Sequence, residues 1–378
     1  MSVTRRAFLQ LLAVQSMATM LGDPFPARAA GAGLAIGNGE MERGVSKAFW
    51  AQPITRPGEI ILMDFGSPHH QSYRTAFLPH KIFQKPTDHA RLVYLDKWGY
   101  LGGELDTRSR ATREILAPPG SRFAGHAAFT PDGQQLLVSV FHDTPQVSEI
   151  AVYDTDTWQV ARSFSSHGLS PHDLTLAGPG QVAIVNGGRF KDDWMDKAKA
   201  VPPEYAHANI SVIEYGTGQL VDQLRSERGD IFFAHFLDLG DGLYFASGLS
   251  NKLTEKASGP IGFFDLKNKE QKHFPDDPTI KSFGGEALSL AATPNGQVLF
   301  VTFKQSGQVV VVDIPGRRVR GALKVDQPRG VAIEGNTLLV SRHGDGMQYY
   351  DISTTPPTLR SGNKLACEGS HFSQVTLD

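Results

Sequence analysis

The sequence predicts an all-β fold, a seven-bladed β-propeller in which the N- and C-terminal segments close one blade together. Short apolar strands alternate with turns throughout the chain, which has 39 glycines and 23 prolines in 378 residues. Units of four such strands recur at the spacing of a propeller blade. The strand-like segments left over at the two ends are complementary, and pairing them would leave no open sheet edge.

The N-terminal residues 1–29 have the features of an export signal. A twin-arginine motif at 4–9 precedes an apolar stretch at 7–21 and a small-residue cleavage site at 27–29. The stretch is shorter than the roughly 20 apolar residues of a membrane-spanning helix. We therefore expect a periplasmic protein exported in the folded state, with no membrane span in the mature chain and a single propeller domain over residues 30–378.

Composition narrows the possible functions. Cys367 is the single cysteine, so neither an intrachain disulfide nor a thiolate cluster for zinc or iron–sulfur can form. The formal net charge is −2 with both signs interspersed, which favours neither nucleic acid nor an anionic membrane surface as a partner. We expect a monomer that is stabilised by its hydrophobic core.

Residues 126–164 show the blade pattern most clearly, as four strands of about four to seven residues separated by turn signals such as Asp132-Gly133. Five more units follow the same pattern, at residues 80–116, 172–225, 235–274, 286–324 and 329–360. The seventh blade is expected to combine residues 371–377, as its first strand, with 47–52, 59–65 and 73–78. A six-bladed ring or an open sandwich is the alternative.

One unit contains an insertion, Gly187 to His207, between its second and third predicted strands. That connection lies on the face where the first strands begin, so the insertion could cover the axial opening. A solvated surface excursion explains it equally well.

Five of the thirteen histidines come just before short apolar segments, at His80, His126, His172, His235 and His371. Alternate residues of an innermost strand face the central channel, so the first residues of these strands meet at one mouth. The sequence therefore predicts a ring of histidines there.

The two remaining units add Glu286, or a neighbour, and Arg329 to the ring. Three or four imidazoles at about 2.0–2.1 Å hold iron, copper, nickel or zinc without cysteine. His167, Asp173 or Glu286 could orient these histidines or add a ligand. Arg329, Glu286 and His167 are also candidate contacts for a bound cofactor. A propeller mouth is wide, so only some of the histidines can reach one ion. A small anionic or chelated ligand, or a water-filled structural channel, remains an alternative.

Other motifs are weaker candidates for a functional site. A G-x-S-x-G nucleophile elbow is missing from the sequence, so a serine hydrolase is disfavoured. Trp50, Trp98 and Trp158 are expected to pack between blades, whereas Trp194 lies in the insertion. His69-His70 and His343 fall in loops, where isolated histidines are usually solvated.

One resemblance rests on the segments Gly125-His126 with Phe129 and Pro131-Asp132-Gly133, Val152-Tyr153-Asp154, Ser166-His167-Gly168 with Pro171-His172, and Val185-Asn186-Gly187-Gly188. These segments resemble a known family of twin-arginine-exported proteins, domain of unknown function 1513, which is WD40-like in its propeller architecture. The resemblance implies a periplasmic seven-bladed propeller associated with iron-uptake components. It implies no catalytic activity and supplies no established site.

Three functions follow from these observations. The first is a propeller that binds a transition metal or metal complex at the histidine ring, in iron or copper handling, with periplasmic metal-uptake proteins as partners. The second is a cofactor-dependent oxidoreductase that uses the same ring. The third is a protein-docking scaffold without metal, a common use of propellers. The sequence assigns no catalytic residue, which favours the non-enzymatic functions.

Overall fold

The computed structural model describes residues 31–38, 48–51, 60–63, 79–97, 99–109, 111–142, 148–188, 207–250, 260–274, 286–342, 346–363 and 369–377. These residues form strands and turns, and none of them belongs to a helix that could cross a membrane. The export signal, most of the insertion, the loop histidines 69, 70 and 343, and Trp98 and Trp194 lie outside the described residues.

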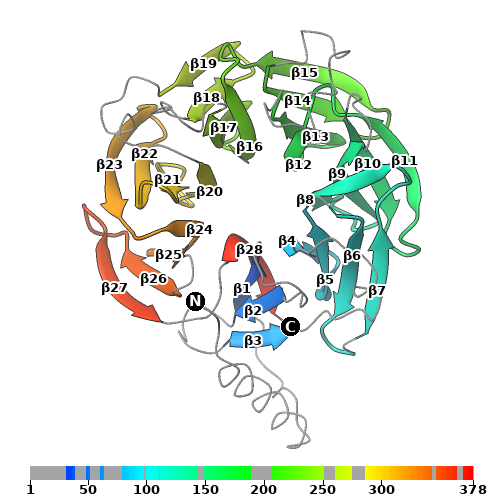
Figure 1. Cartoon of the computed structure of the whole chain (residues 1–378), viewed down its shortest axis with the longest axis horizontal. Coiled ribbons are helices and arrows are strands. Elements are labelled where there is room, and N and C mark those ends of the chain that lie inside the picture. Colours follow the sequence, from blue (N-terminus) through cyan, green and yellow to red (C-terminus); the bar gives the residue numbers. More distant parts are fainter. Residues whose placement is uncertain are drawn as a thin grey trace, which may run out of the picture.

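The described strands form seven four-stranded antiparallel sheets arranged in a ring (Figure 1). The first three sheets in chain order are β4 (Pro79–Lys85), β5 (Asp88–Asp96), β6 (Leu101–Asp106) and β7 (Thr112–Leu116); β8 (Ser121–Phe129), β9 (Gln135–His142), β10 (Glu149–Asp154) and β11 (Val160–Ser165); and β12 (Pro171–Gly178), β13 (Gln181–Asn186), β14 (Asn209–Glu214) and β15 (Gln219–Arg225).

The next three sheets are β16 (Ile231–Asp238), β17 (Leu243–Ser250), β18 (Ile261–Asp265) and β19 (Glu270–His273); β20 (Ala287–Ala292), β21 (Val298–Phe303), β22 (Gln308–Asp313) and β23 (Arg318–Lys324); and β24 (Pro328–Glu334), β25 (Thr337–Arg342), β26 (Met347–Asp351) and β27 (Thr358–Asn363). The last sheet has the order β28 (Gly369–Leu377), β1 (Gly31–Asn38), β2 (Ala48–Ala51) and β3 (Ile60–Met63).

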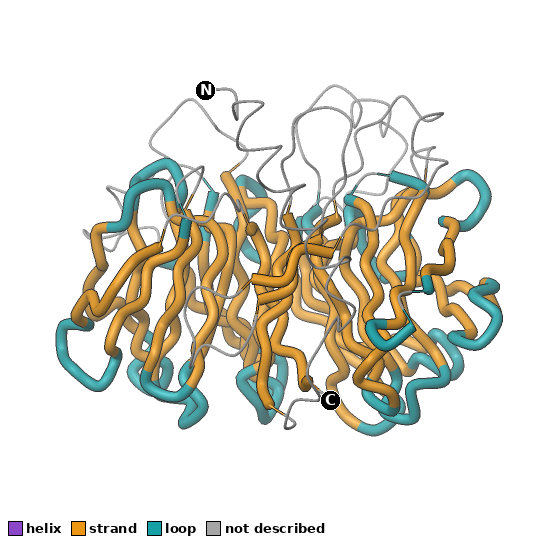
Figure 2. Tube along the Cα trace, turned by 90° about the horizontal axis from the view of Figure 1, so that it is seen from below, coloured by secondary structure: helices purple, strands orange, loops and turns teal. Residues whose placement is uncertain are grey.

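The innermost strands surround the centre of the ring (Figure 1). Each of β4, β8, β12, β16, β20, β24 and β28 contacts the next, and β28 contacts both β24 and β4. Seen from the side, the sheets stand next to one another with turns at both ends (Figure 2). The arrangement is all-β and propeller-like, with one sheet built from strands near both ends of the chain.

That last sheet differs from the sequence prediction in one strand. The strand paired with β28 is β1, whereas the sequence placed residues 47–52 there. The segment 47–52 instead supplies β2, the third strand, and 59–65 supplies β3, the outermost. The predicted strand at 73–78 lies outside the described residues. Strand β1 was not predicted from the sequence because its glycines have low strand propensity.

The hydrophobic core lies between neighbouring sheets. In one such layer, Val93 and Leu95 of β5 pack with Phe123 of β8 and Tyr153 of β10, all of them buried. Alternation along each strand sends one set of side chains to each neighbouring layer, so every sheet is covered on both faces. This stacking holds the ring together and fixes where the innermost strands lie.

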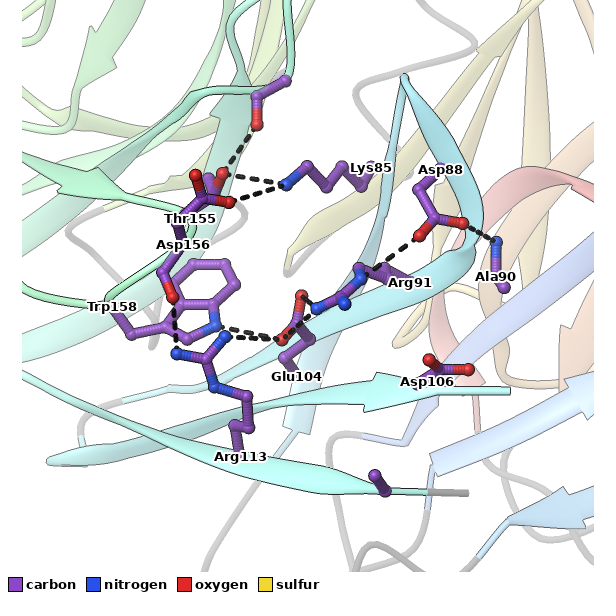
Figure 3. A network of polar contacts seen from close by, with 12 residues as sticks. Lys85, Asp88, Ala90, Arg91, Glu104, Asp106, Arg113, Thr155, Asp156 and Trp158 are labelled. Carbon is purple, nitrogen blue, oxygen red and sulfur yellow. Dashed lines mark hydrogen bonds and ion pairs between the residues drawn. The ribbon is translucent and has the colours of Figure 1, made fainter. Parts of the chain in front are cut away.

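Polar groups reinforce the junction between the first two sheets (Figure 3). Glu104, buried in β6, receives hydrogen bonds at 3.1 Å from the Arg91 guanidinium and at 3.1 Å from the Trp158 indole N–H of the next sheet. Lys85 donates to the Thr155 hydroxyl across the same junction, at 3.0 Å. Trp158 therefore packs between sheets, as predicted.

A β-bulge occurs in each of the seven innermost strands. Between two register pairs, the innermost strand always has at least one residue more than its partner. The intervals are Pro79/Lys81, Phe123/Ala127, Pro171/Leu174, Phe233/His235, Ala287/Leu290, Pro328/Val331 and Gly369/His371. A bulge bends its strand and re-aims the neighbouring side chains. Six of these bulges contain or border a residue that the sequence predicted for the ring, whereas the bulge of β20 does not include Glu286.

Candidate metal centre

Three histidines from the innermost strands of three consecutive sheets converge. His126 lies on β8, His172 on β12 and His235 on β16, and all three are buried, with relative exposures of 0%, 2% and 4%. Their ring centroids are 4.8 Å apart for His126–His172, 4.8 Å for His172–His235 and 5.3 Å for His126–His235. We call these three residues the histidine triad.

The three ring nitrogens of the triad are slightly farther apart than the ligands of a bound metal ion. One ring nitrogen from each histidine lies within 4.8 Å of the other two. Three atoms with these separations all lie within about 2.8 Å of a point between them, where an ion could bind. Metal–imidazole bonds are about 2.0–2.1 Å long, so an inward movement of about 0.7 Å per nitrogen would satisfy them. Rotation of the imidazole rings can supply a movement of this size.

The bulges bring the triad together. In β8 the bulge includes Gly125, whose φ of 89° lies in a region that residues with a side chain rarely adopt. The Ser139 hydroxyl of β9 then lies between two bulges and shares its one proton between the carbonyl of His172, at 2.7 Å, and that of His126, at 3.2 Å. One buried hydroxyl thus sets the separation of two triad members.

The start of β12 is held by the segment that precedes it. The buried Asn186 side chain donates at 2.9 Å to the Ser166 carbonyl, and Asn186 pairs in register with Pro171. A side chain at Gly168 would meet the Cβ of Asn186 at 2.5 Å, so only glycine fits there. The segments 166–172 and 185–188 therefore form one packed unit that positions His172.

Asp173 orients one member of the triad. Its Oδ1 lies 2.8 Å from Nδ1 of His126, and its side chain is also buried. A carboxylate that accepts a hydrogen bond from the Nδ1–H group favours the tautomer with its lone pair on Nε2. Metal-ligating histidines commonly make this contact with a carboxylate, which fixes the ring and raises its basicity.

The electrostatics disfavour protonation of His126 and His235 and favour ionisation of Asp173. Burial lowers the pKa of His126, although Asp173 opposes this change. Burial and the proximity of His126 hold the pKa of His235 well below its ordinary value. Burial would raise the pKa of Asp173, but attraction to His126 and Lys81 outweighs it and lowers that pKa. Neutral imidazoles beside an ionised carboxylate are the protonation states that bind a metal cation.

The other two predicted histidine ligands have described backbones only. His80 lies within the bulge of β4, and His371 borders the bulge of β28. Their positions in the fold correspond to those of the triad, while their side chains lie outside the described residues. Of the histidines whose side chains are described, the structure brings together His126, His172 and His235.

The three predicted cofactor contacts occupy different places. Arg329 lies in the bulge of β24, is buried, and accepts a hydrogen bond on its carbonyl from Thr302 at 2.6 Å. Glu286 precedes β20 and lies outside its bulge, where Leu288 and Ser289 stand instead. Glu286 itself therefore lies two residues before the bulge, and its neighbours Leu288 and Ser289 occupy the bulge position.

His167 is directed away from the triad. Its backbone has a φ of 57°, and its Nε2 lies 3.2 Å from the Gly218 carbonyl in the turn between β14 and β15. These are the outer strands of the sheet. The structure thus places His167 in a packing contact, and the residue that contacts a triad histidine is Asp173.

Two lysines near the triad were not identified from the sequence. Lys81 of β4 lies 3.8 Å from Asp173 and interacts electrostatically with His126 and His235. Lys97, just after β5, interacts with the same two histidines, and burial lowers its pKa. Lys81 lies within a predicted strand and Lys97 directly follows one, but strand periodicity does not show where the end of a long side chain lies.

Comparison with known proteins agrees with this fold. The family model described as "Protein of unknown function (DUF1513)" matches residues 79–366, which include the whole triad. No curated protein matches the sequence.

Solved propeller structures share the architecture at low sequence identity. The RRP9 WD40 repeats align with a TM-score of 0.58 at 12% identity, over 79% of this chain and 84% of theirs. U3-55K aligns with a TM-score of 0.55 at 12% identity, over 79% and 85% of the two chains. A chain of the mitotic checkpoint complex aligns with a TM-score of 0.55 at 9% identity, over 84% and 92%. Identities this low establish the fold alone.

Proposed function

We propose that this chain, which belongs to the DUF1513 family, binds one transition metal ion through His126, His172 and His235. The observation that carries the proposal is the convergence of three buried imidazoles, with Asp173 in contact with one of them. One ring nitrogen from each of the three lies within 4.8 Å of the other two, so together they offer three donors to one ion. Imidazole ligands suit iron, copper, nickel and zinc, and we propose iron or copper handling as the role.

Three protein ligands leave room for at least one more group on the ion. Sites that carry a metal as cargo, or that act on a bound substrate, keep such an open position, whereas structural zinc sites are closed by four protein ligands. An oxidoreductase function is compatible with the same arrangement, and turnover of a redox-active metal would distinguish it. Binding without turnover supports handling of the metal.

We also propose the cellular setting that the sequence indicates. Residues 1–29 act as a twin-arginine signal, the mature protein folds as a closed seven-bladed propeller, and it works in the periplasm with metal-uptake proteins. Export of a reporter fused to residues 1–29, and its loss when Arg5 and Arg6 are replaced by lysine, tests the localisation.

The metal site is tested by elemental analysis and calorimetry. Protein purified without chelators is expected to contain about one transition metal ion per chain. Metal-free protein is expected to bind Zn²⁺ or Cu²⁺ with a stoichiometry of one, and His172→Ala is expected to weaken binding at least tenfold. His89→Ala, a matched change in β5 outside the triad, should leave it intact.

Thermal unfolding separates loss of binding from loss of folding. A ligand at 100 times its Kd stabilises a fold by about 2.7 kcal/mol, so metal should raise the Tm of the wild type and of His89→Ala. It should not raise the Tm of His172→Ala, even where that variant is folded. Full metal binding by His172→Ala, or no metal binding by the wild type, would refute the proposed site.

A further inference from the structure

Asp173 connects the histidine triad to a lysine of a neighbouring sheet. Its Oδ1 lies 2.8 Å from Nδ1 of His126, and the same oxygen lies 3.8 Å from Nζ of Lys81. Lys81 belongs to β4, His126 to β8 and Asp173 to β12, three innermost strands that follow one another around the ring. One carboxylate oxygen therefore interacts both with a proposed metal ligand and with an ammonium group.

The ammonium group of Lys81 is close enough to the triad to act on a cation there. The two contacts to Oδ1 of Asp173 put Nζ of Lys81 at most about 7 Å from Nδ1 of His126. Charges at this range interact appreciably at the effective dielectric constant of a protein, about 20. Burial lowers the pKa of His126 and of His235, and the charge of Lys81 acts in the same direction on both. Lys81 thus opposes positive charge on two of the three imidazoles, and it would oppose a metal cation in the same way.

Asp173 has contacts other than Lys81 that hold it beside the triad. The Leu174 N–H donates to its Oδ1 at 3.1 Å, and His126 lies against the same oxygen. The Asp173 side chain is buried, with 11% exposure, whereas that of Lys81 is partly exposed, at 29%. Loss of the lysine charge therefore leaves the carboxylate in place, and its main effect on the triad is electrostatic. Removing a positive charge beside a cation site strengthens binding of the cation.

We propose that Lys81 lowers the affinity of the histidine triad for metal ions, and lowers it more for ions of higher charge. Lys81 is then a specificity-determining residue that offsets the attraction of Asp173 for the bound ion. Because Coulomb repulsion is proportional to the charge of the ion, the free-energy penalty on a divalent ion is twice that on a monovalent ion. Lys81 therefore shifts the selectivity of the site towards lower charge states, such as Cu⁺ relative to Cu²⁺. This inference rests on the proposed metal site and deepens it, because it names the charge class of ion that the site selects.

Affinities for two ions of different charge test the proposal. Metal-free wild type and Lys81→Met are titrated by calorimetry with Zn²⁺ and with Ag⁺, a monovalent ion that also binds imidazole, in chloride-free buffer at pH 7.5. Lys81→Met is expected to bind Zn²⁺ about 10- to 100-fold more tightly than the wild type, the effect of one unit charge that is partly screened by solvent. The expected gain for Ag⁺ is the square root of this, about 3- to 10-fold.

Two further variants are the controls. Lys81→Arg keeps the positive charge and should bind both ions as the wild type does. Lys267→Met makes the same change in an exposed lysine that pairs with Asp241 far from the triad, and it should also leave both affinities unchanged. Thermal unfolding of each metal-free variant shows whether it is folded. Lys81→Gln removes the charge with a polar side chain and replaces Lys81→Met in the titrations if that variant does not fold.

The outcomes separate the two proposals. If the wild type binds neither ion, both the metal site and the role of Lys81 are refuted. If the wild type binds zinc, and loss of the Lys81 charge does not tighten that binding, only the role of Lys81 is refuted. An equal gain for Zn²⁺ and Ag⁺ also refutes it, because a change in packing or ring position would act on both ions alike. A larger gain for Zn²⁺ than for Ag⁺, with Lys81→Arg unchanged, supports it.

Discussion

Replacing Asp173 with asparagine changes the triad without removing a ligand. The side chain keeps its size, but it loses its charge and gains an amide that can donate a hydrogen bond. Placed 2.8 Å from Nδ1 of His126, that amide would favour the imidazole tautomer with its proton on Nε2. This tautomer has no lone pair on Nε2, so it would have to change before His126 could bind an ion through that nitrogen.

The expected loss follows from this contact. Removing the carboxylate partner of a metal-ligating histidine typically costs 10- to 100-fold in metal affinity. That range corresponds to about 1.4–2.7 kcal/mol. The variant also removes the negative charge that attracts the cation, and Lys81 loses the acidic group 3.8 Å away. Both changes act in the same direction, so we expect the upper part of the range.

The assay is a competition titration of Zn²⁺ against a chromophoric chelator at pH 7.5. Asp241→Asn is the matched control, because Asp241 is exposed and pairs with Lys267 far from the triad. The control should bind zinc as the wild type does. An Asp173→Asn affinity within threefold of the wild type would show that the carboxylate does not orient His126, and the reasoning from that contact would be wrong.

The remaining predictions concern stability. Burial lowers the pKa of His126 and His235, and that of His273 to about 4. Because the unfolded chain takes up these protons near pH 6.5, stability of the metal-free protein is complete above that pH and declines below it. At pH 5.5 each histidine that stays neutral in the folded protein lowers the free energy of unfolding by about 1.4 kcal/mol. Identical urea midpoints at pH 7.5 and pH 5.5 would contradict this expectation. Ser139→Ala, which removes the hydroxyl between two bulges, should cost about 1–3 kcal/mol in urea unfolding and weaken zinc binding. Trp158→Phe should cost about 1–3 kcal/mol by depriving a buried carboxylate of its indole donor, without affecting zinc affinity.

Strand alternation and turn residues are local signals, which is why most of the fold could be predicted. The turn at Gly133 lies between β8 and β9, as expected, and these two strands are the apolar segments predicted on either side of it. Strand β1 was missed because its pairing with β28 joins residues more than 300 positions apart, and its glycines give no local pattern. Long-range pairing of this kind depends on the whole ring.

The candidate site could be predicted in composition but not in detail. Periodic spacing identified the triad histidines, and Asp173 was among their possible partners. The bulges decide which histidines converge, and a bulge such as that at Gly125 has only a weak sequence signal, a single glycine. The contribution of Lys81 and Lys97 depends on where flexible side chains end, which strand periodicity does not describe.

The bulges have a consequence for how this protein can diversify. A residue within a bulge takes no part in the ladder pairing, so its side chain can change while the sheet keeps its register. Leu288 occupies in β20 the kind of position that His172 occupies in β12. The ring therefore offers a set of interchangeable positions around one axis, and a few substitutions there can redesign the chemistry of the centre on an unaltered scaffold.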